Sequence, residues 1–131
     1  MINSDCFDFS FSGLKTALKY ALKADSDWKD RIPEYCFEYQ QAIIDVLLHK
    51  TIKAAQKHNV KTIMLAGGVA ANKELRKQIK EKIASKLPNI KYQALDIKYT
   101  TDNAAMIASI GYFKAKNKNF TAWQNLVVNN N

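Results

Sequence analysis

The feature that most constrains the fold is a pair of short apolar runs, each followed by a polar turn and a helical pattern. The first run is TIML at residues 62–65, and the second is IKYQALD at residues 90–96. Strands that alternate with helices pair in parallel, because the intervening helix returns the chain to the same end of the sheet. We therefore expect an α/β lobe with a thin sheet covered by helices. Residues 62–65 are apolar on both faces, which is typical of a strand buried on both faces.

Two further helices are predicted before the first strand. Alternating Phe and Ser give way to apolar residues three or four apart, so one helix begins near Ser12, the predicted N-cap. Residues 24–33, with three Asp and a Pro, predict a loop. The longest helix is expected from Pro33 to about His58, with Asn59 supplying a left-handed turn after it. A third helix should start at Asn72, with Leu75, Ile79 and Ile83 on its apolar side.

Positive charge is concentrated in the second part of the chain. The 131 residues include 20 Lys+Arg and 12 Asp+Glu, for a net charge of +8. Residues 1–45 hold five basic and eight acidic side chains (−3), whereas residues 46–131 hold fifteen and four (+11). This distribution suits a polyanion such as RNA. On charge alone, solvated helix faces in a lysine-rich chain are the favoured explanation.

The cysteines and the hydropathy point to a cytoplasmic protein without a membrane span. Cys6 and Cys36 are thirty residues apart and form no CxxC motif, so we expect reduced thiols. No apolar run approaches the ~20 residues that a transmembrane helix needs.

The stretch LAGGVAANKELR has two interpretations. Gly67 and Gly68 let the backbone approach a ligand closely, and the helix that follows offers N–H groups to an anion. Asn72 in its first turn has an amide that suits a ribose or a phosphate. The alternative is an ordinary strand-to-helix turn with Asn72 as N-cap. Neither GxGxxG nor GxxxxGK[ST] occurs, so spacing alone favours the ordinary turn.

Asp102 presents a similar choice after the second strand. It either caps the last helix or ligates a metal at the carboxyl edge of the sheet. One carboxylate is not a metal site, and His49 and His58 are nine residues apart, on opposite faces of one helix. The sequence contains no HExxH motif, which excludes a self-contained zinc peptidase of that type.

Three segments together resemble a known family. DFSFSGLKTA at residues 8–17, AGGVAANKELR at residues 66–76 and TTDNAAMIA at residues 100–108 are similar to the C-terminal half of tRNA threonylcarbamoyladenosine transferases, in the bacterial or organellar branch. The order, the spacing and the long helix between them also match. The resemblance implies the C-terminal lobe of an actin-like ATPase fold, with residues 1–131 as this single lobe.

The resemblance also implies an activity and site residues. Family members transfer threonylcarbamoyl from its adenylate to N6 of the adenosine beside the anticodon of tRNA. The adenylate contacts fall on Gly67, Gly68 and Asn72, and one ligand of a divalent metal, iron or zinc, falls on Asp102. Implied partners are tRNA, a paralogous scaffold protein, a P-loop ATPase and the N-terminal lobe of the same enzyme.

The HxxxH pair that supplies two further metal ligands in the family has no counterpart here. We therefore expect this chain to be the second half of such an enzyme, inactive alone and without a stable metal of its own. Contacts to the tRNA backbone are expected on the basic side of the helix after Asn72. The candidate residues are Lys73, Arg76, Lys77 and Lys80.

Two other functions stay open. One is a non-catalytic paralogue of the same fold that serves as a dimerisation scaffold, although a scaffold needs neither Asn72 nor Asp102. The other is a simple basic RNA-binding module, which the absence of stacking aromatics at the sheet edge makes less attractive.

Overall fold

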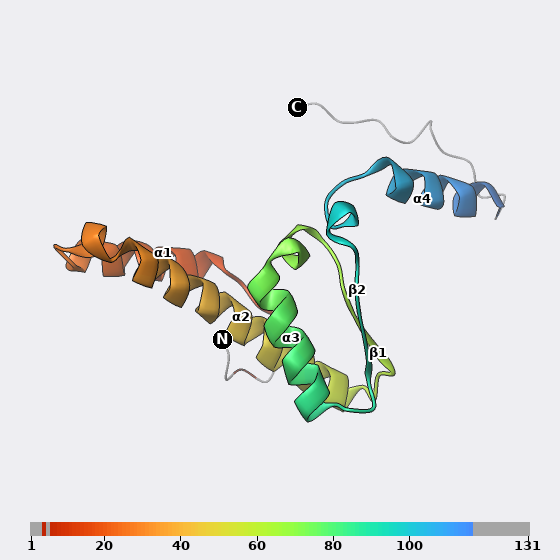
Figure 1. Ribbon diagram of the computed structural model, residues 1–131, viewed down its shortest axis with the longest axis horizontal. Helices are drawn as coiled ribbons and strands as arrows, with labels where there is room; N and C mark the ends of the chain where they lie inside the picture. The colour runs from red at the N-terminus through yellow and green to blue at the C-terminus, as the bar shows by residue number, and fades with distance from the viewer. Residues whose placement is uncertain (1–3, 5, 117–131) are drawn as a thin grey trace.

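A computed structural model describes residue 4 and residues 6–116, so the apolar cluster of the tail sequence NFTAWQNLVV, at residues 119–128, lies outside the described residues. The helices and strands follow one another in the predicted order (Figure 1). The α-helices and strands are α1 (Ser12–Ala24), α2 (Ile32–Lys57), β1 (Thr62–Leu65), α3 (Lys73–Lys86), β2 (Lys91–Ala94) and α4 (Ala104–Lys116). Short 3-10 helices lie at η1 (Trp28–Arg31), η2 (Gly68–Ala71) and η3 (Ile97–Tyr99).

The sheet consists of β1 and β2 in parallel, which confirms the predicted pairing. Thr62 lies opposite Lys91 and Leu65 opposite Ala94. The ladder continues at both ends, because the Lys91 N–H donates to Lys61 O and the Leu95 N–H donates to Leu65 O. The crossover α3 connects the two strands, so both strands run toward the same edge.

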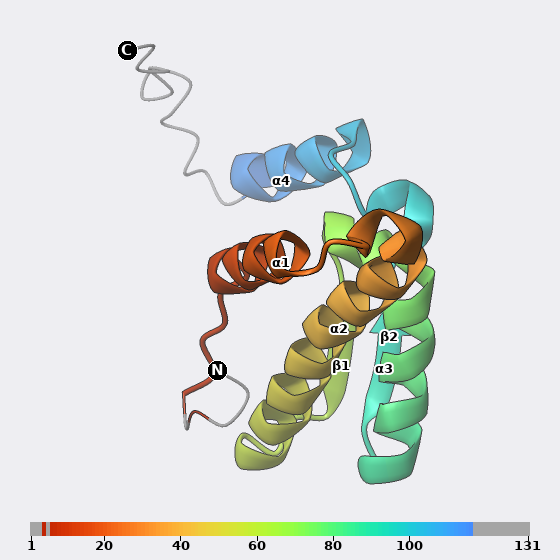
Figure 2. The same ribbon diagram turned by 90° about the vertical axis from the view of Figure 1, so that its left-hand side faces the viewer.

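The core lies between α2, α3 and one face of the sheet (Figure 2). Its buried side chains are Ile44, Leu48, Ala55, Ile63, Leu75, Ile79, Ile83 and Leu87. The apolar side predicted for α3 is therefore buried as expected. The other face of the sheet has no such cover, since Met64 on β1 is 61% exposed. The expectation that β1 is buried on both faces is wrong, because helices cover this two-stranded sheet on one side.

The first and last residues of the long helix agree closely with the prediction from the sequence. Helix α2 begins one residue before Pro33, which stands in the first turn where a missing N–H costs nothing. Asn59 follows with a φ of +49°, the left-handed turn that was predicted.

Two predictions before α2 need correction. Ser12 is not the N-cap of α1: Phe11 holds that position without a side-chain cap, and Ser12 Oγ lies 2.8 Å from Ser10 Oγ. The predicted loop contains the 3-10 turn η1, at Trp28–Arg31. Asp25 anchors this turn by accepting from Tyr35 Oη (2.8 Å) and Arg31 Nη1 (3.0 Å). The hydrogen bond from the Tyr35 hydroxyl is the main reason why the pKa of the Asp25 carboxyl is lowered.

Lys50 ties the N-terminal segment to α2. Its side chain is 3% exposed, and its ammonium donates to Ser4 Oγ (2.9 Å) and to the backbone oxygens of Cys6 (2.8 Å) and Asp8 (2.6 Å). An ammonium has three donors, so these acceptors replace water around a buried cation.

Helix α4 forms where it was predicted but contributes no buried residue. Its apolar side chains are exposed, among them Met106, Ile107, Ile110 and Phe113. Figures 1 and 2 show α4 beyond the carboxyl edge of the sheet, away from the α2–α3 pair. In the part of the chain that the structure describes, no helix is long and apolar enough to cross a membrane.

Ile79→Ala tests where the core lies. Ile79 is buried on α3, so its truncation should lower the free energy of unfolding by about 2–5 kcal/mol. Ile110→Ala makes the same change on α4, where the side chain is 57% exposed, and should cost less than about 1 kcal/mol. Urea denaturation of both variants measures the difference. Equal losses would contradict this placement of the core.

Candidate functional site

The turn between β1 and α3 requires glycine at one position. Gly67 has φ +89° and ψ 168°, a conformation that only glycine adopts readily. A methyl group at either Gly67 or Gly68 would meet no atom within 4 Å, so the backbone there lies open to the surroundings. Among the described residues, the N–H groups of Gly68 and Val69 have no hydrogen-bond partner. The turn therefore presents open backbone with two donors available.

Asn72 caps α3, as the structural interpretation of the sequence predicted. Its Oδ1 accepts from the Leu75 N–H at 2.9 Å. Its Nδ2 donates to Gln40 Oε1 of α2 at 2.8 Å, which fixes the orientation of the amide. Because an amide nitrogen carries two hydrogens, one donor of Asn72 is left for a ligand. The cap and a ligand contact are thus compatible.

Arg76 connects the two strand exits and does not project into solvent with its neighbouring lysines. Its Nε donates to Ala70 O in η2, and its Nη2 donates to Leu95 O, just after β2, at 2.6 Å. Charge-assisted hydrogen bonds of this kind are about twice as strong as neutral ones. Arg76 therefore holds the turn after β1 beside the end of β2, a role that the sequence analysis missed. Its position one residue after Leu75, at the flank of the buried side of α3, was the available signal.

Asp102 is exposed and does not cap α4. The cap is Asn103, whose Oδ1 accepts from the Met106 N–H at 3.1 Å. Thr100 fixes the preceding turn, since it is 4% exposed and its Oγ1 donates to Ile97 O at 2.7 Å. Asp102 thus follows a rigid turn with its carboxylate in solvent. In the described residues no hydrogen bond joins it to the Gly67–Asn72 turn.

The predicted site residues thus lie at two separate places in the fold. Gly67, Gly68 and Asn72 share the exit of β1, whereas Asp102 follows β2 and η3. Across the described ranges, no group of three or more His, Cys, Asp or Glu side chains is placed to bind a metal ion. The residues present fit an anionic, nucleotide-like ligand at the turn. They do not fit a complete metal site.

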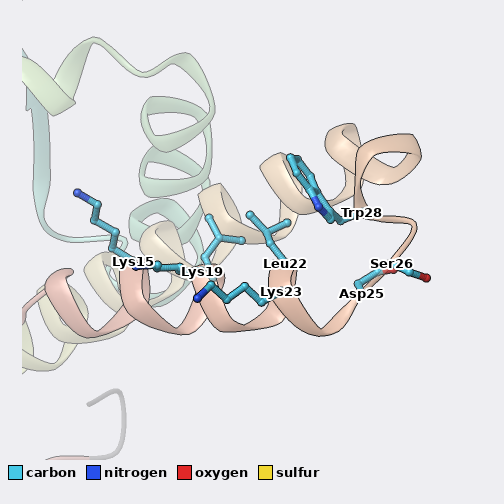
Figure 3. A pocket seen from close by; sticks show the side chains of 8 residues that line it. Lys15, Lys19, Leu22, Lys23, Asp25, Ser26 and Trp28 are labelled. Carbon is cyan, nitrogen blue, oxygen red and sulfur yellow. The ribbon is translucent and has the colours of Figure 1, made fainter.

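A groove of about 500 Å³ lies elsewhere, between α1 and η1 (Figure 3). The stems of Lys15, Lys19 and Lys23 line it together with Leu22 and Trp28. It contains none of the residues that the sequence placed in the site.

Comparison with known proteins identifies the family. A sequence model described as tRNA N6-adenosine threonylcarbamoyltransferase matches residues 2–109. The protein of this name from Thermosipho africanus is 47% identical over 114 residues, or 86% of this chain. Its counterpart from Fusobacterium nucleatum is 48% identical over 116 residues, or 85% of this chain. The chain belongs to the tRNA N6-adenosine threonylcarbamoyltransferase family.

The fold of the family agrees with the observed architecture. Threonylcarbamoyltransferases of this family have the actin-like ATPase fold, and the α/β arrangement of this chain agrees with the predicted fold class. The match covers 33% of the Thermosipho africanus relative, so the chain spans about one third of the length of that protein.

Gly67→Ala tests the turn that holds the candidate site. An alanine at φ +89° should cost roughly 1–3 kcal/mol of unfolding free energy. Gly68→Ala is the matched control, because φ there is not positive and a methyl group meets open space. It should leave stability nearly unchanged. Denaturant titration of the pair would refute this turn geometry if both variants were equally stable.

Proposed function

We propose that this chain is the C-terminal lobe of a tRNA-modifying transferase. The enzyme moves threonylcarbamoyl from threonylcarbamoyl-adenylate to N6 of the adenosine beside the anticodon. Family membership supports the reaction, and the Gly67–Asn72 turn supports a contact of this lobe with the adenylate. The observation that carries this assignment is Asn72, whose amide is oriented by Gln40 and retains one N–H donor.

The geometry of the turn suits the charge that the reaction develops. The adenosine amine attacks the carbamoyl carbon and gives up one proton to water, the bond from that carbon to the phosphate oxygen breaks, and negative charge collects on the departing adenylate phosphate. The N–H groups of Gly68 and Val69 and the positive end of the α3 dipole lie at one place in the fold. We infer that they stabilise the leaving phosphate, while Asn72 fixes its orientation.

We propose that Asp102 contributes one ligand to the divalent metal, iron or zinc, that the resemblance implies. A catalytic metal normally has three protein ligands, so the others would come from the N-terminal lobe of the same enzyme. A paralogous scaffold protein, a P-loop ATPase and a cytoplasmic location are also proposed on the resemblance alone. Lys73, Lys77 and Lys80 are exposed on α3 and remain proposed contacts to tRNA, whereas Arg76 has the structural role described above.

Substitution of Asn72 tests the adenylate contact. Asn72→Ser keeps a side-chain N-cap but removes the amide donor. Its affinity for AMP, measured by calorimetry on this chain, should fall about three- to tenfold, as expected for one lost hydrogen bond. Thermal unfolding of Asn72→Ser should stay near that of the unmodified chain, whereas Asn72→Ala should also lose about 1 kcal/mol of stability. Unchanged AMP affinity in the folded Asn72→Ser variant would remove Asn72 from the site.

The proposed ligand set for the metal predicts the behaviour of the chain alone. The purified chain should hold less than one equivalent of iron or zinc and should not turn over threonylcarbamoyl-adenylate. Asp102→Asn should leave that low metal content unchanged. Elemental analysis that finds one equivalent in the unmodified chain, and its loss in Asp102→Asn, would contradict the proposal.

A further inference from the structure

The end of the molecule opposite the candidate site is strongly basic. Helices α2 and α3 both end there and both strands begin there, whereas the Gly67–Asn72 turn lies at the other end (Figure 2). The lysines on the terminal turns and strand starts at this end are Lys53, Lys57, Lys61, Lys82, Lys86 and Lys91. We call this set the basic end. Lys91 lies opposite Thr62, and its N–H donates to the neighbouring Lys61 O at 3.0 Å, so the two lysines start adjacent strands but point to opposite faces of the sheet.

The basic end includes a groove between α2 and α3. Its volume is about 480 Å³, and its lining residues are Leu48, His49, Ile52, Lys53, Gln56, Lys82 and Lys86. The cations come from both helices, and Lys82 and Lys86 are four residues apart, so they lie on the same side of α3. Leu48 and Ile52 contribute apolar side chains, so the groove combines cations with a partly apolar lining.

Few carboxylates balance this charge. Between residues 46 and 101 the acidic residues are Glu74, Glu81 and Asp96. Glu74 is in the first turn of α3 and Asp96 follows β2, so both belong to the opposite end. Glu81 lines a neighbouring groove with Asp45 and Glu74, and that groove shares Leu48 and Lys82 with the groove of the basic end. Of these three carboxylates only Glu81 lies beside the basic end, so the lysines there outnumber the nearby acidic residues of this segment and favour an anionic partner.

Helix dipoles account for part of this arrangement only. A cation in the last turn of a helix is favourable, which explains Lys57 on α2 and Lys86 on α3. Lys61 and Lys91 lie at strand starts, outside the last turn of either helix. Lys53 and Lys82 sit about one turn further back and face a shared groove. The cations of the basic end thus come from two helices and two strand starts, and the dipole of one helix does not account for all of them.

We propose that the basic end binds the phosphate backbone of the tRNA substrate, an inference that rests on the proposed function. Helix α3 has 14 residues, so the two ends of the lobe are about 21 Å apart. This separation corresponds to several base pairs of an A-form RNA stem. A stem held at the basic end can thus place a nucleotide near the Gly67–Asn72 turn. Lysine contacts to phosphates position the RNA without reading its sequence.

Paired alanine substitutions in the chain test this surface. Lys82→Ala/Lys86→Ala removes two exposed cations of the basic end. Lys19→Ala/Lys23→Ala is the matched control, since it removes two exposed lysines at the same spacing on α1, beside the groove of Figure 3. Binding of an unmodified tRNA transcript is measured between about 50 and 200 mM salt, the range over which phosphate contacts dominate the affinity. Thermal unfolding checks that both variants remain folded.

The basic-end variant should bind tRNA at least tenfold more weakly. The slope of log affinity against log salt should decrease by nearly two, at ~0.9 per phosphate contact. The α1 variant should change the affinity less than threefold. Equal effects of the two variants, an unchanged slope in the basic-end variant, or no tRNA binding by the unmodified chain would each overturn the proposal. The AMP titration with Asn72→Ser judges the proposed function separately, because it does not involve RNA.

Discussion

One side chain, Arg76, links the two segments that leave the carboxyl ends of the strands. Two strands of four residues each provide little rigidity at their ends, and the segments that leave them bear the candidate site. Arg76 reaches from α3 to Ala70 O on one side and to Leu95 O on the other. Its guanidinium is planar and carries several N–H donors in a fixed arrangement, so one side chain can donate to both oxygens at once. The turn at Gly67 and the exit of β2 are thereby kept side by side.

The cap of α3 depends on the same frame. The Asn72 Oδ1 accepts from the first turn of α3, and one Nδ2 hydrogen is donated to Gln40. The second Nδ2 hydrogen therefore points in a fixed direction. Such preorganisation suits a group that orients a phosphate, because no rotamer entropy is lost when the ligand arrives. The structural and the ligand-binding interpretations of LAGGVAANKELR are therefore not exclusive. The turn that starts the helix also leaves the N–H groups of Gly68 and Val69 available.

The regular elements and the cap were predictable because they depend on local patterns. The spacing of Leu75, Ile79 and Ile83 sets the buried side of α3, and Asn72 has the residue type of an N-cap. The predictions that were wrong concern side chains whose exposure and contacts depend on tertiary packing. Arg76 was grouped with the exposed lysines around it, but its angular position at the edge of the buried side directs it to backbone oxygens. Met64 is exposed because a second layer of helices is absent from that face in the described residues. Asn103, one residue from the predicted Asp102, forms the cap of α4.

We propose a lobe with a nucleotide end at the Gly67–Asn72 turn and an RNA end at the C-terminus of α3. The most direct test is an amide and side-chain NMR titration of the isotope-labelled chain with AMP. We expect shifts confined to the backbone amides of Gly67, Gly68 and Val69 and to the side-chain amides of Asn72 and Gln40. The amides of Lys82 and Lys86 should not move. Shifts that cluster in the lysine groove of α2 and α3, with the Gly67–Asn72 turn unaffected, would contradict this proposal.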